Sequence, residues 1–126
     1  MKSYTDLEQS KKLAEILPLE SSDMHSEAIE IDGDMVFVVV FGLGDKNKSN
    51  YGSRIWSLAA LLGVLKKYGL IDLRFLSSTF DSRGEHLINV WCCMFDNITV
   101  SFDCYADNPV DVCYEMIIKL HELKML

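Results

Sequence analysis

Apolar residues fill most positions of the C-terminal stretch 107–126, DNPVDVCYEMIIKLHELKML. Asp107 or Asn108 can cap a helix there, and Pro109 suits the first helical position, where its missing N–H has no intrahelical partner. At about 100° per residue the charged side chains fall on one narrow strip, and apolar residues occupy most of the remaining circumference. A helix that exposes so little polar surface is typical of a buried element. The pattern therefore predicts a helix over about 109–124, sunk into the body of the protein.

Two further helices follow from local signals. Residues 5–17 begin with Thr5 and Glu8 in the spacing of a capping box, and Pro18 stops the helix because a proline pushes the preceding residue out of the α region. The almost wholly apolar stretch before Gly69 predicts a second buried helix, which ends near residue 67 and begins near residue 54 or 57.

A hairpin is predicted over 28–41, because Asp32-Gly33 separates two apolar runs and Asp-Gly is a strong two-residue turn signal. The first run, AIEI, alternates between apolar and polar residues. The second run, MVFVVVF over 35–41, is apolar throughout. Continuous apolar runs are typical of strands covered on both faces, so we expect this strand to be buried on both sides.

Three more strands are predicted after the second helix, over about 71–77, 86–95 and 98–104. A two-residue turn at Asp96-Asn97 joins the last two. The stretch LINVWCCMF does not alternate, so it predicts a central strand that is covered on both sides or whose second face meets another subunit. The final strand alternates and should be half exposed.

The predicted order α-β-β-α-β-β-β-α indicates an α+β domain with a mainly antiparallel five-stranded sheet and three helices packed on it. A chain of 126 residues is long enough for one domain with its own hydrophobic core, so 1–126 is interpreted as a single globular domain.

Charge and composition narrow the classes of partner. The net charge of −7 makes the surface acidic, which disfavours binding to the phosphates of nucleic acids. The N-terminal residues lack the apolar core of a secretory signal, and no apolar run reaches the length of a membrane span. We therefore expect a cytoplasmic protein that does not contact a membrane.

No catalytic motif is visible, so we assign no catalytic residue, no cofactor and no metal site. The four cysteines show no C-x-x-C spacing and are interpreted as reduced, buried apolar residues: Cys92, Cys93, Cys104 and Cys113. Gly42-Leu43-Gly44 follows a strand, as in a nucleotide-binding fingerprint. Asn47 stands where the third glycine would fall, so these two are interpreted as loop glycines.

The one long polar loop, 42–53, is the place where recognition is most readily sited, because binding residues concentrate on loops held by a rigid scaffold. Its sequence GLGDKNKSNYGS contains two lysines, amides and a tyrosine. The candidate binding residues of this loop and of the helix after it are Asp45, Lys46, Lys48, Tyr51 and Trp56. An ordinary solvated connector remains the alternative for the loop.

Three stretches carry a resemblance: QSKKLAEILPLESSDMH, WSLAALLGVL and DNPVDVCYEMIIKLHEL. Together they resemble a family of small uncharacterised proteins from gut Bacteroides-type bacteria and their phages or mobile elements. The family carries no assigned activity, so the resemblance implies no functional residue. Its members usually have a proline-bearing segment before WSLAALL, whereas this chain has GLGDKNKSNYGS there.

Two functions of different classes remain open. The first is a small protein-binding module, interacting or regulatory and without catalytic activity. A homodimer is one form of that binding, and a target in the host is expected if the gene belongs to a mobile element. The second is a small-ligand binder or an enzyme, whose pocket would lie near the 42–56 loop.

Overall fold

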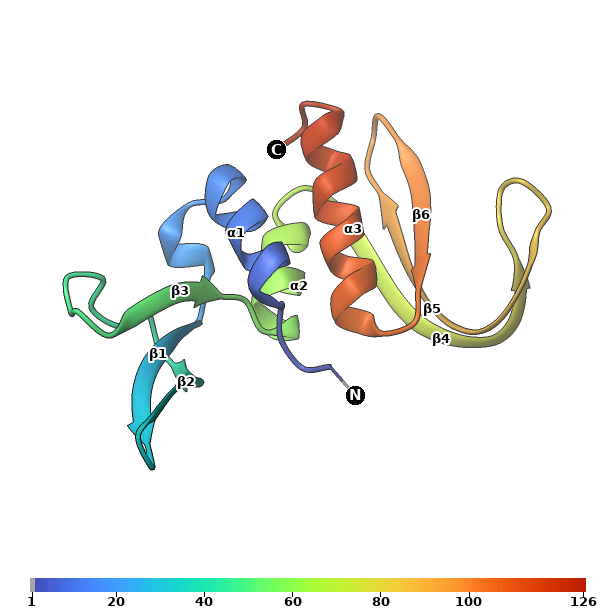
Figure 1. Ribbon diagram of the computed structural model, residues 1–126. Helices are drawn as coiled ribbons and strands as arrows, with labels where there is room; N and C mark the ends of the chain where they lie inside the picture. The colour runs from blue at the N-terminus through green and yellow to red at the C-terminus, as the bar shows by residue number, and fades with distance from the viewer. Residues whose placement is uncertain (1) are drawn as a thin grey trace.

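The computed structural model describes residues 2–126, and its elements are arranged in three layers, with the helices between two small sheets (Figure 1). The first sheet contains β1 (Met24–Ile31), β2 (Asp34–Phe41) and β3 (Tyr51–Ile55), and the second contains β4 (Leu70–Phe80), β5 (His86–Asp96) and β6 (Ser101–Ala106). The helices are α1 (Leu7–Ile16), α2 (Leu58–Lys66) and α3 (Pro109–Glu122), with a short 3₁₀ turn, η1 (Leu19–Ser21), after α1. The predicted α+β class is confirmed.

The prediction of one five-stranded sheet is wrong, because six strands form two separate three-stranded antiparallel sheets. Their orders are β2-β1-β3 and β4-β5-β6. The predicted succession of helices and strands is confirmed, with β3 as an additional strand. Its sequence, YGSRI, has no apolar alternation, and it becomes a strand by pairing with the other side of β1.

Local signals placed the helix ends to within a few residues. Asn108 caps α3 and Pro109 occupies the first position, as expected, and Ser57 caps α2 through its side chain. The capping box of α1 is shifted by one residue from the prediction. Asp6 is the cap and Gln9 completes the box.

Thr5 has a different role from the predicted cap. Its side chain is buried, its hydroxyl lies 2.7 Å from that of Ser10, and it accepts a hydrogen bond from the backbone N–H of Trp56. The backbone N–H of Thr5 in turn donates to the Trp56 carbonyl oxygen. These bonds fasten the N-terminal segment to the junction between β3 and α2.

The main hydrophobic core lies between the helices and the second sheet. Helix α3 packs against α2, β5 and β6, and it buries Pro109, Val110, Val112, Cys113, Met116, Ile117 and Leu120. Leu13, Trp56, Leu61, Leu65 and Phe95 are fully buried in the same cluster. In the described chain, no residue of the first sheet belongs to this cluster, although Met24 and Ile55 are buried close to the helices.

The prediction that residues 35–41 are buried on both faces is wrong. Strand β2 lies at the outer edge of the first sheet and pairs only with β1. Met35, Phe37 and Phe41 are exposed, by 65%, 69% and 83% respectively. The Asp32-Gly33 turn itself is as predicted, with φ of 51° and 84° at its two central residues, and it carries the hairpin away from the body (Figure 1).

Strand β5 is the central strand of its sheet, as predicted, but it is not covered on both faces, because Ile88 and Met94 are exposed. The turn after β5 is also longer than expected. The chain forms a loop over 97–100 in which the Asn97 side chain accepts hydrogen bonds from the N–H groups of Thr99 and Val100. Strand β6 therefore begins at Ser101 rather than at Ile98. Within residues 2–126, no helix combines the length and the hydrophobicity that crossing a membrane requires.

Removing apolar atoms from the buried face of α3 should destabilise the whole protein. Ile117 is fully buried, so Ile117→Ala should lower the free energy of unfolding by about 2–5 kcal/mol. Glu115 is exposed on the same helix, and Glu115→Ala should change it by about 0.5 kcal/mol or less. Urea unfolding followed by circular dichroism measures both, and equal effects would contradict the assigned core.

Candidate functional site

The predicted loop residues Asp45, Lys46 and Lys48 lie together on the exposed connection between β2 and β3. The carboxylate of Asp45 accepts a hydrogen bond from the backbone N–H of Asn47, and its carbonyl oxygen accepts one from Lys48. These bonds fix the turn locally. Neither Lys46 nor Lys48 forms an ion pair among residues 2–126.

The structure does not bring Trp56 to the same surface. Trp56 is fully buried in the main core, where its indole N–H donates a hydrogen bond to the Ser21 hydroxyl at 3.0 Å. A side chain in this position cannot contact a ligand bound at the loop. The indole ring of Trp56 thus connects η1 to the segment before α2.

Tyr51 and His25 form the floor of the loop. Their rings stack with centroids 5.7 Å apart, and the Tyr51 hydroxyl is buried without a hydrogen-bond partner among residues 2–126. The Nδ1 atom of His25 donates to the Gly42 carbonyl oxygen at 2.7 Å. Gly44 covers the imidazole, and a Cβ there would lie 2.6 Å from the ring, so this glycine lets the loop close over His25. The loop glycines therefore have a structural role.

The cysteines are free and lie in or beside the core. Cys93 is buried, and a hydrogen bond with Cys113, followed by burial itself, raises its pKa. Burial raises the pKa of Cys104 to about 11. These two thiols are protonated at neutral pH, which suits apolar packing rather than nucleophilic attack. Within residues 2–126, no three His, Cys, Asp or Glu side chains are placed to hold a metal ion.

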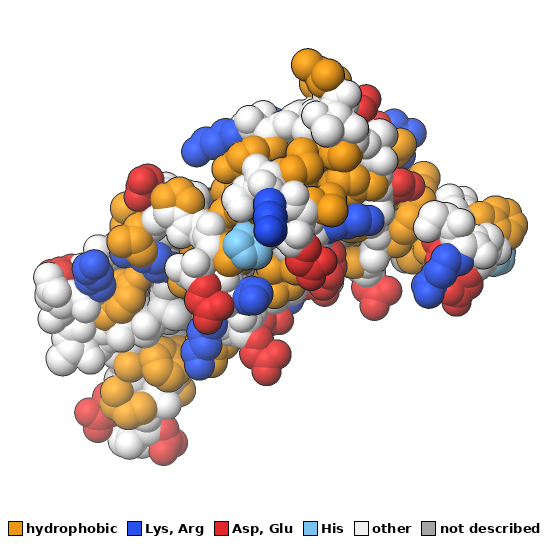
Figure 2. All heavy atoms as spheres, turned by 90° about the horizontal axis from the view of Figure 1, so that it is seen from above, with side chains coloured by type: hydrophobic (Ala, Val, Ile, Leu, Met, Phe, Trp, Pro, Cys, Tyr) orange, Lys and Arg blue, Asp and Glu red, His pale blue; other side chains and the backbone are white. Residues whose placement is uncertain are grey.

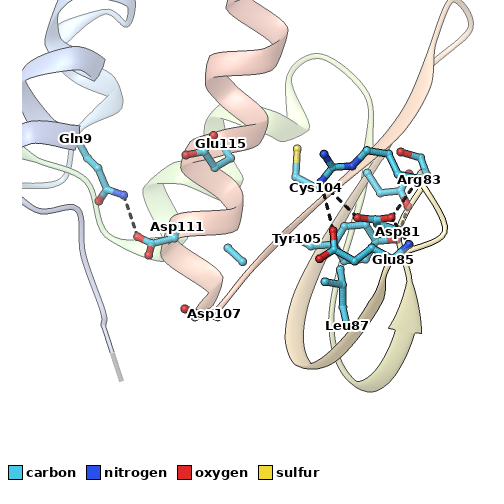
Figure 3. A pocket seen from close by; sticks show the side chains of 13 residues that line it. Gln9, Asp81, Arg83, Glu85, Leu87, Cys104, Tyr105, Asp107, Asp111 and Glu115 are labelled. Atoms are coloured by element: carbon cyan, nitrogen blue, oxygen red, sulfur yellow. Dashed lines mark hydrogen bonds and ion pairs between the residues drawn. The ribbon is translucent and has the colours of Figure 1, made fainter.

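A polar hollow of about 640 Å³ opens between α3 and the turn that joins β4 to β5 (Figure 3). Six acidic residues line it: Asp81, Glu85, Asp103, Asp107, Asp111 and Glu115. In Figure 3, Asp111 on α3 points towards Gln9, on the side away from the turn that carries Asp81, Arg83 and Glu85. Arg83 forms ion pairs with Asp81 at 3.7 Å and Glu85 at 3.6 Å, so part of this charge is already neutralised.

Three neighbouring side chains donate hydrogen bonds to Asp111. Its carboxylate accepts hydrogen bonds from the Lys2 ammonium at 2.8 Å, the Gln9 amide at 2.8 Å and the Asn108 amide at 2.7 Å. Partial burial alone would raise the pKa of Asp111, but these bonds outweigh burial and hold the pKa below its ordinary value. Asp111 therefore ties the N-terminal segment to α3.

A second hollow, with a mainly apolar lining, lies beside α1 and the first sheet. It has a volume of about 430 Å³ and is bounded by the start of α1 and one face of the first sheet. The lining residues are Tyr4, Thr5, Asp6, Leu7, Lys11, Ser26, Phe37, Val39, Gly52, Ser53 and Ile55. We call it the apolar groove. Leu7 is 58% exposed at its wall, and Phe37 and Val39 make it continuous with the exposed strand β2.

Sequence reasoning missed the groove and the exposed strand beside it. The signal that could have found them is the seven-residue apolar run 35–41, which was assigned to the interior. Within residues 2–126 no helix packs extensively on this run, because α2 and α3 pack against the second sheet and α1 packs mainly against β3.

Comparisons with protein-family models, with curated proteins and with solved structures found no match to this chain.

The Asp111 network should make stability depend on pH. Because the folded-state pKa is lowered, this stabilisation is present above the unfolded-state pKa of about 3.9 and is lost as the pH falls through the folded-state value. At pH 7, Asp111→Asn should lower the free energy of unfolding by about 1 kcal/mol or less, since the side chain is partly exposed. The difference from the wild type should shrink below about pH 4.

Urea unfolding of both proteins at pH 7 and at pH 3 measures this difference. Asp107→Asn is the matched control, because Asp107 is exposed and makes no side-chain hydrogen bond or ion pair in the described chain. A difference for Asp111→Asn that stays constant with pH would contradict the network.

Proposed function

We propose that this protein acts by binding another protein chain, and that strand β2 is the centre of its binding surface. The observation that carries the proposal is the exposure of Met35, Phe37 and Phe41 on an edge strand. Each such side chain that stays in water lacks the stabilisation of about 1.5–3 kcal/mol that its burial would give. Natural proteins usually blunt a sheet edge with charge or proline, and residues 35–41 contain neither.

The surroundings of β2 also suit a protein ligand. In the space-filling view from above, the left part of the molecule, which holds the first sheet in Figure 1, carries hydrophobic side chains, and acidic side chains mark the end of its projecting limb (Figure 2). Beyond β1, no element of residues 2–126 packs extensively against β2. An extended segment could therefore add to the open edge by β-augmentation, in which backbone hydrogen bonds give affinity and apolar side chains give specificity.

The state of the reactive side chains described above supports binding rather than chemistry. The buried thiols are protonated, Asp111 is occupied by three donors, and His25 is enclosed by Gly42 and Gly44. The expected cytoplasmic setting, and a target in the host of a mobile element, remain part of the same proposal.

Phe37→Lys should weaken partner capture by about tenfold or more, because an apolar anchor at the centre of an interface is replaced by a charge. The full-length protein is immobilised, exposed to an extract of its source cells, and compared with the variant by quantitative mass spectrometry. Since Phe37 is exposed in the single chain, the free energy of unfolding of the monomer should change little.

Ile98→Lys is the matched control, because Ile98 is fully exposed on the loop between β5 and β6 and undergoes the same change of chemistry. The proposal requires a protein that is recovered with the wild type and with Ile98→Lys but lost with Phe37→Lys. Recovery of the same proteins with all three would show that β2 is not the binding surface.

A second candidate function, favoured by the apolar groove, is the binding of a small apolar molecule. The groove volume of about 430 Å³ lies within the range of small-molecule sites, and its walls are mainly apolar. Gly52, Ser53 and Ile55 lie in the groove wall, so this site adjoins the loop at which a pocket was expected. Lys11 and the hydroxyl groups of Ser26 and Ser53 could orient a polar end of the ligand.

A thermal-shift screen with medium-chain fatty acids and planar aromatic compounds tests this candidate. A ligand at 100 times its dissociation constant should stabilise the fold by about 2.7 kcal/mol and raise the melting temperature by several degrees. Leu7→Lys should abolish the shift by placing a charge at the groove, whereas Leu19→Lys, also on an exposed leucine, should retain it. No shift with any compound, or a shift unaffected by Leu7→Lys, would refute the candidate.

A further inference from the structure

The outer edge of β2 presents backbone groups whose direction can be deduced from the bonds inside the sheet. The Ala28 N–H donates to the Asn50 carbonyl oxygen, on the β3 side of β1. In an antiparallel ladder, successive residues direct their backbone groups to opposite sides, so Ile29 points towards β2, where its partner is Val36. The alternate residues of β2 consequently point outwards: Met35, Phe37, Val39 and Phe41.

We propose that the occupant of this edge is a second copy of the same chain, with the two β2 strands pairing antiparallel across a twofold axis at Val38. The inference rests on the proposed function, because it names the partner of the surface described there. The β2-β1-β3 sheet of one copy would join the same sheet of the second copy, which gives one six-stranded sheet. Each copy would thereby cover the open β2 edge of the other. A twofold interface uses the same patch on both copies, which an apolar, nearly uncharged strand satisfies.

The register follows from the direction of the backbone groups. Residues that point outwards on one copy must face residues that point outwards on the other. With the axis at Val38, Met35 lies opposite Phe41 of the second copy and Phe37 lies opposite Val39. This is the only such register that engages all four outward-facing residues, and it forms about eight backbone hydrogen bonds. Shifting the axis to Phe37 would place Phe41 opposite the Gly33 turn.

The exposed aromatic side chains of β2 supply up to about half of the area that a dimer of ordinary size buries. Phe37 and Phe41 are aromatic side chains of about 150–250 Å² that are 69% and 83% exposed, so together they offer on the order of 200–400 Å² per copy. A standard interface buries about 800 Å² per partner. Met35 and Val36 on the strand, with Tyr4 and Leu7 beside the groove, are exposed apolar residues that contribute to the remainder.

Charge favours this antiparallel arrangement over a parallel one. The tip of the hairpin is acidic, with Glu30, Asp32 and Asp34, whereas the loop at the other end of β2 carries Lys46 and Lys48. With the axis at Val38, Asp34 lies opposite Gly42 of the second copy, so each acidic tip lies at the end of the sheet that carries the other copy's lysines. Parallel pairing would instead bring the two acidic tips together, at a cost from like-charge repulsion.

The first experiment measures the mass in solution. Light scattering on a size-exclusion peak of the full chain should give twice the chain mass of 14.3 kDa, with dissociation on dilution. Phe37→Lys should give the monomer mass, and Ile98→Lys should keep the dimer. A wild type that stays monomeric at its highest soluble concentration, or a dimer that survives Phe37→Lys, would overturn the inference.

The second experiment tests the register. Val38 faces its own copy across the axis in a non-hydrogen-bonded pair, where Cα atoms lie about 4.5 Å apart, within the range that a disulfide spans. Val38→Cys should therefore form a covalent dimer on mild oxidation, seen on a non-reducing gel. Val36→Cys should not, because residue 36 of the second copy would lie four residues away along the strands, roughly 13 Å. Equal cross-linking of both variants, or of the wild type, would refute the register.

The two proposals fail in different ways. A monomeric wild type whose partner capture is lost in Phe37→Lys would refute self-pairing and leave the protein-binding function in place. A dimer that dissociates in Phe37→Lys, with no change in the proteins captured, would show that β2 serves self-association alone.

Discussion

The burial of α3 between α2 and the second sheet is the contact on which most of the structure depends. Seven residues of this helix are buried, and the helix packs against α2, β5 and β6. The N-terminal segment joins the same helix through Lys2 and Gln9, which both hold Asp111. The beginning and the end of the chain are therefore fixed to one another, and the first sheet is the part that remains outside this arrangement.

The elements that could be predicted from the sequence are those specified by neighbouring residues. The Asn108-Pro109 start of α3, its buried face and the Asp32-Gly33 turn all depend on spacings of a few residues, and all are present. The exposure of residues 35–41 could not be predicted, because an apolar run is compatible both with the interior of a sheet and with an exposed binding edge. Which of these it occupies depends on whether a helix covers it, and this is decided by distant residues.

The candidate site shows the same division. Composition was sufficient to place Asp45, Lys46 and Lys48 on an exposed loop. It could not show that Trp56, only five residues beyond Tyr51, turns into the core, because that depends on its bonds to Thr5 and Ser21. The acidic hollow and the apolar groove each combine segments that are far apart in the chain, so neither has a signature in any single stretch.

The separation of the first sheet from the main core has a consequence for the motions of the molecule. Regions with few buried apolar contacts open locally at a lower free energy than the regions that carry the core. The β1–β2 hairpin could thus fray and re-form many times during the lifetime of one folded α3, so the two halves of this single domain would behave as separate cooperative units. Any chain that pairs with β2 would then contribute stability to the half of the molecule that has least of its own.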